Sequence, residues 1–376
     1  MTTTPSIRVP DNDLRLALEQ VLSEYFGCRC PIRVLRRRRS NYSSSCGIEN
    51  LEVEFARGRR LSLVFKDLSP TALLKTAQAV RPRFFYDPLR EIETYRTVLD
   101  PGRYGTAICY GAIHQPELQR YWLFLERVRG PLLWQVGKIT SWRRAAQWLA
   151  GLHTEFNVPR NSDPGNPGLP AGTKSVFDRN SPPTGGSRQM PARMAVLPGH
   201  LLNYDRQLFG VWLERADKFL RPKRATQTAT VRRQFRRLAN RYDRVINRLL
   251  ALPQSFIHGE FYPSNIILRD TALTSRICPI DWEAAAIAPG LIDLTALTSG
   301  DWSPDQRREL VSAYREALEP ADGWPPAMPE LLELVDYCQL HLAMQWLGWA
   351  ADWSPPKMHA HDWLSEVFRL AKRLGL

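Results

Sequence analysis

The sequence predicts an α+β protein of two lobes, a small N-terminal lobe built on an antiparallel sheet and a larger, mainly helical C-terminal lobe. In the first third of the chain, apolar and polar residues alternate in several short stretches, as in strands with one buried face. After residue 129, apolar residues instead recur at spacings of three and four, which is typical of helices packed on a core. The 376 residues are enough for two such lobes. We therefore divide the chain into residues 1–128 and residues 129–376.

The N-terminal lobe is expected to begin with a helix. Leu14, Leu18 and Leu22 share one face of a helix over residues 10–27, which Gly27 ends. Strands with alternating apolar residues follow, and a helical region separates the first three from two more. The expected strands span residues 32–38, 51–55, 61–66, 106–113 and 121–126, and the helical region spans residues 71–80 and 87–99. This order predicts a small sheet with a helix inserted between its third and fourth strands.

Helices dominate the rest of the sequence. They are expected at residues 142–156, 204–220, 228–250, 304–318, 330–351 and 362–374. Short apolar strands are expected at residues 255–257, 266–268 and 277–280. Residues 157–200 are rich in Pro, Gly, Ser and Asn and lack periodicity, so we interpret them as a loop insertion.

The composition is that of an ordinary globular protein, but the net charge of +13 is high. Such a charge suits nucleic acid, an anionic membrane surface or an anionic small ligand. No RNA-binding signature or zinc finger accompanies the arginine-rich stretches, so we expect no nucleic-acid partner. No apolar run is long enough to span a membrane, and the first ten residues lack a signal core. The six cysteines are scattered, so we expect a reduced cytoplasmic protein without a membrane partner.

The most informative stretch is His-Gly-Glu-Phe-Tyr-Pro-Ser-Asn at residues 258–265, which a short gap separates from Ile-Asp-Trp at residues 280–282. It places the carboxylate of Glu260 five residues before the amide of Asn265, with Asp281 after a further strand. The first carboxylate is suited to orienting an attacking hydroxyl. The amide and the second carboxylate are suited to holding magnesium against nucleotide phosphates. Turn capping by Asn265 and Asp281 is the structural alternative.

This stretch resembles the catalytic loop of the aminoglycoside phosphotransferase and choline kinase family. Four blocks follow one another at the family's spacing, at residues 256–260, 265–268, 280–283 and 290–294. The one departure is Glu260, where the family usually has Asp. The resemblance covers most of the chain and implies a two-lobed protein-kinase-like fold. It also implies transfer of the γ-phosphate of ATP or GTP, with Mg²⁺, to a hydroxyl of a small molecule.

The resemblance assigns roles to residues of the C-terminal lobe. Glu260 takes the position of the catalytic Asp, which accepts or orients the proton of the acceptor hydroxyl. Asn265 and Asp281 correspond to the two magnesium ligands. His258 is expected to brace the loop rather than to transfer protons, and Asp293 is expected to support the loop or to start a helix.

In the N-terminal lobe, Lys66 ends the third expected strand and lies on the face opposite Leu63 and Phe65. It corresponds to the family's strand lysine, which contacts the phosphates of ATP and pairs with a helix glutamate. Glu91 is the expected partner, and Glu93 is the second choice. Further nucleotide contacts are expected from the small residues of a loop and from the backbone of the hinge between the lobes, namely Ser44, Ser45, Glu126 and Val128.

Glu260 leaves a second function open. Its carboxylate reaches about 1.5 Å further than that of Asp, and misplacement by about an ångström can cost about a hundredfold in rate. The alternative to an active kinase is a nucleotide-binding pseudokinase that acts as a regulatory or scaffold module. Redirected chemistry, such as nucleotidyl transfer at the same site, is a third interpretation. The net charge favours a neutral or anionic acceptor over a polycationic aminoglycoside.

Tryptophans are frequent in the last expected helices. Trp346, Trp349 and Trp353 follow one helical face together with Leu342. A buried core stripe is the simpler interpretation. An aromatic wall of the acceptor site is the alternative, because the resemblance implies that C-terminal helices build that site.

Overall fold

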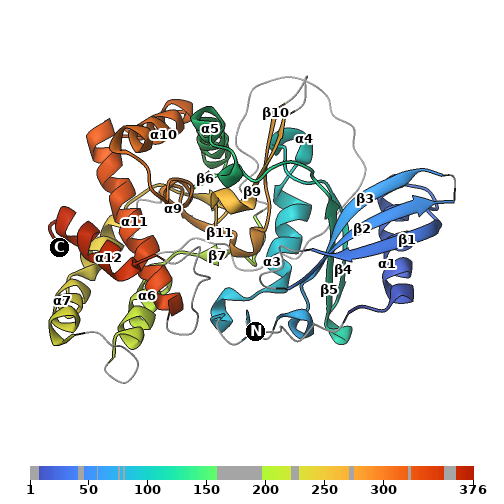
Figure 1. The fold of residues 1–376 in the computed structure, drawn as a ribbon, viewed down its shortest axis with the longest axis horizontal. Coiled ribbons are helices and arrows are strands. Elements are labelled where there is room, and N and C mark those ends of the chain that lie inside the picture. The colour runs from blue at the N-terminus through green and yellow to red at the C-terminus, as the bar shows by residue number, and fades with distance from the viewer. Residues whose placement is uncertain are drawn as a thin grey trace.

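A computed structural model of the chain has the two-lobed α+β architecture that the sequence predicts (Figure 1). The residues that the structure describes are 8–40, 46–56, 58–74, 77–78, 81–158, 197–221, 228–270, 275–320, 323–350 and 361–376. Ser44 and Ser45 lie outside them, as does most of the expected insertion at residues 157–200.

The N-terminal lobe contains a five-stranded antiparallel sheet in the order β1-β2-β3-β5-β4. Its strands are β1 (Ile32–Arg39), β2 (Gly47–Phe55), β3 (Arg60–Asp67), β4 (Cys109–Gln115) and β5 (Arg120–Glu126). Helix α1, Asp11–Phe26, packs on one face of this sheet. Leu14 and Leu18 of α1 share a buried apolar cluster with Val53 and Phe65. Apolar residues on one face of each strand therefore form the core of this lobe.

The segment between β3 and β4 lies between the sheet and the helical lobe (Figure 1). Helix α3, Pro88–Glu93, continues as a π-helical turn over Thr94–Val98, where the sequence predicts one α-helix. Such turns are frequent at functional sites. The short helix α4, Pro101–Tyr104, follows. Of the helix expected at residues 71–80, the described part includes a 3-10 turn at Pro70–Ala72.

The C-terminal lobe is mainly helical. Its helices are α5 (Ile139–Glu155), α6 (Arg206–Phe219), α7 (Ala229–Ala239), α8 (Tyr242–Leu250), α9 (Leu291–Leu297), α10 (Pro304–Ala317), α11 (Met328–Ala350) and α12 (Trp363–Arg373). One apolar cluster includes buried residues from every one of them. Although α11 has 23 residues, neither it nor any other helix in the described part is long and apolar enough to cross a membrane.

Two small sheets accompany these helices. Strands β9 (Ile266–Asp270) and β10 (Ser275–Pro279) form a hairpin. A second sheet has the order β6-β8-β11-β7, with the strands β6 (Asn157–Val158), β7 (Leu202–Asn203), β8 (Gln254–Ile257) and β11 (Ala286–Pro289). The loops that leave β8 and β10 carry the predicted catalytic stretch.

Some expected elements differ from the structure. The single helix expected at residues 228–250 is wrong, because α7 and α8 are separate helices that meet at Asn240 and Arg241. Asn is a weak helix former, since its side chain competes for backbone hydrogen bonds. The buried residues Leu238 and Tyr242 keep a helical spacing across the break, so the apolar pattern does not reveal it. The sequence does not predict the extent of helix α9, in whose first turn Asp293 lies, because all residues of this helix are buried and no exposed face gives a period.

His341 is buried among aromatic side chains of the helical lobe. It is 1% exposed, and its Nδ1 atom lies 3.2 Å from the hydroxyl of Tyr242. The rings of Tyr204 and Phe209 pack edge-on against the imidazole. Burial lowers the pKa of His341 to about 3, so the folded protein keeps the ring neutral.

We expect His341 to lower the stability of the fold as the pH falls. Below a pH of 6.5 the unfolded chain binds a proton at this residue, whereas the folded chain excludes it until a pH of about 3. Replacing His341 with Gln keeps an acceptor for Tyr242 and removes the titration. Between pH 7.5 and pH 5 the variant should therefore gain about 2 kcal/mol relative to the wild type. Urea unfolding at both pH values measures this change, and a constant difference would contradict it.

Candidate active site

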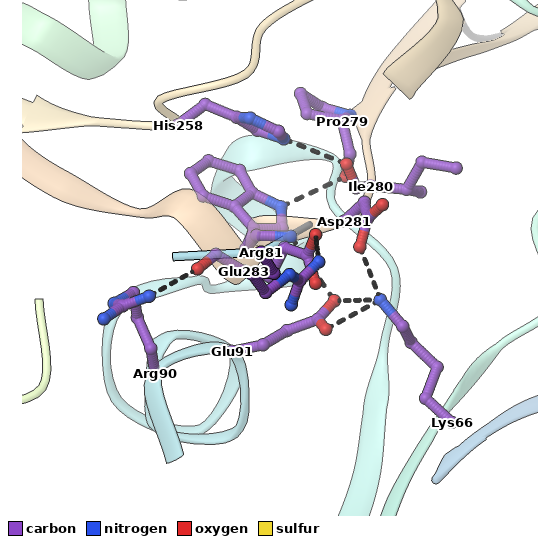
Figure 2. A network of polar contacts seen from close by, with 10 residues as sticks. Lys66, Arg81, Arg90, Glu91, His258, Pro279, Ile280, Asp281 and Glu283 are labelled. Carbon is purple, nitrogen blue, oxygen red and sulfur yellow. Dashed lines mark hydrogen bonds and ion pairs between the residues drawn. The ribbon is translucent and has the colours of Figure 1, made fainter. Parts of the chain in front are cut away.

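Three charged side chains meet between the sheet and the helical lobe (Figure 2). The Nζ atom of Lys66 lies 2.7 Å from each carboxylate oxygen of Glu91 and 2.7 Å from Oδ1 of Asp281. The backbone N–H of Trp282 also donates to Oε1 of Glu91, at 3.3 Å. These residues come from β3, from α3 and from the segment after β10. The fold thus joins three distant parts of the sequence in one polar network.

Local structure explains how the network forms. Leu63 and Phe65 point into the cluster beneath α1, so the alternation of β3 turns Lys66 to the other face, towards α3. Glu91 lies in the first turn of α3 and is 1% exposed. Glu93, the second choice from the sequence, instead pairs with Arg96 at 3.4 Å.

The charges of the network depend on one another. Burial opposes the charge of Lys66, but the carboxylates of Asp281 and Glu91 outweigh it and raise the pKa of Lys66 well above its usual value. Burial raises the pKa of Glu91 to about 7, against the attraction of Lys66. Burial also disfavours the charge of Asp281, but Lys66 outweighs it and lowers the pKa of that carboxyl. Lys66 therefore stays protonated, with Asp281 as its ionised partner.

Removing Lys66 alone should destabilise the fold, because two carboxylates would lose their cation. We expect Lys66→Met to lower the free energy of unfolding by about 3 kcal/mol. Replacing Glu91 with Leu at the same time removes one of the two carboxylates that have lost their cation. The double variant should therefore lose less than the sum of the two single variants. Denaturant unfolding of the four proteins measures this coupling, and losses that add would show that the two residues do not stabilise each other.

The loop after β8 is held by His258 and Asp293. The carboxylate of Asp293 accepts the backbone N–H groups of His258, at 2.6 Å, and of Gly259, at 2.9 Å. The Nδ1 atom of His258 accepts the N–H of Glu260 at 3.2 Å. Its Nε2 atom therefore carries the proton and donates to the carbonyl oxygen of Ile280 at 2.9 Å. His258 thus braces the backbone of Glu260 against the segment that leads to Asp281.

Two residues of this region have left-handed backbones. Gly259 has a φ of 82°, and a Cβ atom there would lie 2.2 Å from the carbonyl oxygen of Ala284, so only glycine fits. Asp281 has a φ of 68°, which is unfavourable for a residue with a side chain. Such strain is concentrated at active sites and ligand-binding sites. At Asp281 it aims the carboxylate at Lys66.

Glu260 lies in a cluster of acidic groups. Burial, followed by the negative charges of Glu283 and Asp281, raises the pKa of Glu260 to about 8. Arg81, which lies 2.5 Å from Glu283, and Lys66 offset this effect in part. Two further carboxylates, of Glu283 and Asp281, and two cations, Arg81 and Lys66, therefore act on Glu260. The preference for a neutral or anionic acceptor, which the net charge of the chain favours, stays a prediction.

The β9–β10 hairpin brings Asn265 and Asp281 together. The N–H of Ile280 donates to the carbonyl oxygen of Asn265 at 2.8 Å, so Asp281 comes directly after this bond. Nδ2 of Asn265 donates to the carbonyl oxygen of Glu260 at 3.0 Å, and Oδ1 of Asp281 contacts Lys66. Among the described residues, Oδ2 of Asp281 and Oδ1 of Asn265 have no hydrogen-bond or ion-pair partner. Such oxygens are the ligands that magnesium prefers.

The residues present therefore fit a magnesium site that the nucleotide completes. Magnesium in such sites is bound by one or two protein side chains, by water and by phosphate oxygens. Within the described ranges, no three His, Cys, Asp or Glu side chains form a metal-binding group of their own. Water and phosphate oxygens would supply the remaining ligands.

The predicted hinge residues lie apart from this network, at the end of β5. The N–H of Val128 donates to the carbonyl oxygen of Glu126 at 3.1 Å. The carboxylate of Glu126 forms an ion pair with Arg276 of β10, at 2.8 Å. The loop that holds Ser44 and Ser45 is outside the described residues.

Sequence comparison agrees with this geometry. The model of the family described as the phosphotransferase enzyme family matches residues 107–330, which include the loop after β8 and the β9–β10 hairpin. The chain belongs to this family. No curated protein matches the sequence.

Solved structures of other phosphotransferases have similar folds. Choline kinase from Cryptosporidium parvum Iowa II is 13% identical with a TM-score of 0.51, over 90% of this chain and 88% of that one. Ethanolamine kinase from Plasmodium vivax is 10% identical with a TM-score of 0.52, over 99% and 90%. The GDP complex of wild-type aminoglycoside 2'-phosphotransferase-IIIa is 12% identical with a TM-score of 0.50, over 96% and 97%. These likenesses show the fold, which is the predicted kinase-like fold.

The structure of this phosphotransferase also places three arginines that the sequence analysis did not select. Arg81 contacts Glu283, and Arg276 contacts Glu126. Arg90 is 3% exposed and donates to the carbonyl oxygen of Glu283 at 2.8 Å, which ties α3 to the segment after Asp281 (Figure 2). The chain has 51 basic residues, and no local pattern distinguishes these three. Only their long-range contacts do so.

Two tryptophans of α11 have different surroundings, one in the apolar core and one against the loop after β8. Trp349 packs against Trp212 in the apolar cluster of the helical lobe. Trp346 instead donates from Nε1 to the hydroxyl of Tyr262, at 3.1 Å, and so contacts the loop after β8. Trp353 is outside the described residues. Neither interpretation of the stripe accounts for both residues.

Proposed function

We propose that this phosphotransferase transfers the γ-phosphate of ATP or GTP to a hydroxyl of a small molecule. The observation that carries the proposal is the network of Lys66, Glu91 and Asp281, with all its Lys66 contacts at 2.7 Å. Phosphoryl transfer depends on positioning and on neutralisation of charge rather than on covalent chemistry by the protein. The network holds a cation and a metal-binding carboxylate side by side, which supports this activity.

The network also favours an enzyme over a pseudokinase. Burying a lysine and two carboxylates carries a large desolvation penalty, which their mutual attraction offsets only in part. Apolar side chains at these three positions would hold β3, α3 and the segment after β10 together at least as well. The retention of all three charges, together with the strained backbone of Asp281, therefore points to a chemical role.

Asn265 and Asp281 would hold the magnesium ion. When bound, the ion supplies positive charge that neutralises the phosphates. Lys66 would contact the phosphates nearer the nucleoside, and Glu91 would keep its ammonium group in place. Asp281 would orient that ammonium group from the other side while its second oxygen binds the metal.

Glu260 would orient the acceptor hydroxyl and accept its proton. A base acts best when its pKa lies near the working pH, and the raised pKa of Glu260 meets this condition. His258 and Asn265 bond to the backbone of Glu260, so its position does not depend on the longer side chain. The extra methylene of Glu260 therefore changes only where its carboxylate lies relative to this fixed backbone.

The backbone of Glu126 and Val128 would read the edge of the nucleotide base. The carbonyl oxygen of Glu126 and the N–H of Val128 are one acceptor and one donor at the start of the hinge. They bond to each other at 3.1 Å, so base binding would exchange this bond for two new ones.

A turnover screen tests the proposal. The protein is incubated with magnesium and ATP or GTP in the presence of neutral, cationic and anionic hydroxyl compounds, and acceptor-dependent release of ADP or GDP is measured. We expect turnover with at least one compound and none with Asp281→Ala. Nucleotide binding without turnover across the library would instead support the pseudokinase.

A further inference from the structure

The β9–β10 hairpin is tied to the hinge by one side chain. Arg276 donates to the carboxylate of Glu126 through two bonds, from Nη1 to Oε1 at 2.9 Å and from Nη2 to Oε2 at 2.8 Å. It also donates to the carbonyl oxygens of Gly105, at 2.6 Å, and of Thr106. A guanidinium that meets a carboxylate through two parallel bonds fixes its orientation as well as its position. Arg276 therefore fixes the end of β5 relative to β10.

Glu126 is held by further contacts. Its carboxylate accepts the N–H of Ile108 at 3.2 Å, and its own N–H donates to the carbonyl oxygen of Ile108 at 2.7 Å. Arg269, which lies opposite Arg276 in the hairpin, reaches the same carboxylate at 3.3 Å. Burial disfavours the charge of Glu126, but the hydrogen bonds from Arg276 outweigh it and lower the pKa of the carboxyl. Glu126 thus stays ionised between two arginines.

The chain that leaves the hinge runs along the same hairpin. The N–H of Leu268 donates to the carbonyl oxygen of Pro131 at 2.9 Å, and Leu132 forms a β-bridge with Ile267. A Cβ atom at Gly130 would lie 1.9 Å from the carbonyl oxygen of Leu268, so the contact requires glycine. The hinge and the hairpin are therefore one connected unit.

The base of this hairpin carries the proposed metal ligands. Asn265 directly precedes β9, and Asp281 follows two residues after the end of β10. We propose that Arg276 is a positioning residue that couples base binding at the hinge to metal binding by Asn265 and Asp281. The inference rests on the proposed function, because it assumes that the chain binds a magnesium–nucleotide complex. Arg276 itself touches neither the proposed metal ligands nor the backbone groups proposed to read the base.

Coupling of this kind is a free energy that binding measurements give directly. The ratio of the Kd of ADP in EDTA to its Kd with magnesium reports how strongly metal and nucleotide support each other. We expect Arg276→Met to lower this ratio about tenfold, mainly through weaker binding in magnesium. Arg269→Met is the matched control, since Arg269 makes one contact to the same carboxylate and its side chain is 47% exposed. Its ratio should stay within about twofold of the wild type.

Several outcomes distinguish an effect of Arg276 on the coupling of metal and nucleotide from an effect on the stability of the fold. Glu126→Gln removes the charge of the same pair and should lower the ratio in the same direction as Arg276→Met. A lower melting temperature of Arg276→Met with an unchanged ratio would overturn the coupling and leave the proposed function intact. A ratio lowered as much by Arg269→Met would also overturn it. A wild-type chain that binds no nucleotide would overturn the proposed function, and this inference with it.

Discussion

Replacing Asp281 with Asn should lower kcat/KM for the nucleotide by about a thousandfold. The carboxylate of Asp281 lies 2.7 Å from Lys66 and is the only charged group of the proposed metal pair. A neutral amide of the same shape keeps the packing but can neither neutralise the metal nor hold the ammonium group. The loss should therefore appear in turnover with the best acceptor found and in magnesium-dependent nucleotide binding.

Asp270→Asn is the matched control for this prediction. It is the same substitution at the opposite end of the same hairpin, where the side chain is 55% exposed and pairs with Arg144. Because exposed ion pairs contribute little, this variant should keep its activity within about twofold. A fall of less than about tenfold for Asp281→Asn would contradict its assignment as the main metal ligand.

Replacing Glu260 with Gln should lower kcat about a hundredfold. The amide fills the same space but cannot accept the proton of the acceptor hydroxyl. The KM for the nucleotide should change little, because the proposed nucleotide contacts come from Lys66, Glu126 and Val128 instead. Rates at saturating nucleotide with the best acceptor measure this effect.

Glu260→Asp provides the comparison within the same chain. It restores the residue usual in the family and keeps a base, but shortens the side chain by about 1.5 Å. We expect it to retain more activity than Glu260→Gln. Equal activity of the Gln variant and the wild type would remove Glu260 from the role of base.

Much of the fold and of the site could be predicted from short-range patterns. The alternation of Leu61, Leu63 and Phe65 indicates the face on which Lys66 lies, and the structure places it there. Glu260, Asn265 and Asp281 are joined by one loop and one hairpin, and the local sequence is enough to predict both. The choice of Glu91 over Glu93 rested on the resemblance, and in the structure Glu91 is the residue that contacts Lys66.

Other features depend on contacts that no local pattern encodes. Arg81 and Arg276 are two of many arginines, and their partners Glu283 and Glu126 lie 202 and 150 residues away in the sequence. The break at Asn240 leaves the apolar spacing intact, so the sequence shows one helix where the structure has two. These features depend on contacts between residues that are far apart in the sequence or on a helix boundary that the apolar spacing does not mark.

The identity of the product distinguishes phosphoryl transfer from nucleotidyl transfer and from nucleotide binding alone. The chain is incubated with magnesium, its best acceptor and ATP labelled at the γ-phosphate, and the acceptor is recovered and examined by mass spectrometry. We expect the acceptor to gain one labelled phosphate on a hydroxyl, and we expect Asp281→Asn to prevent this gain. An acceptor that gains AMP, or a wild-type chain that binds the nucleotide and modifies no acceptor, would contradict this expectation.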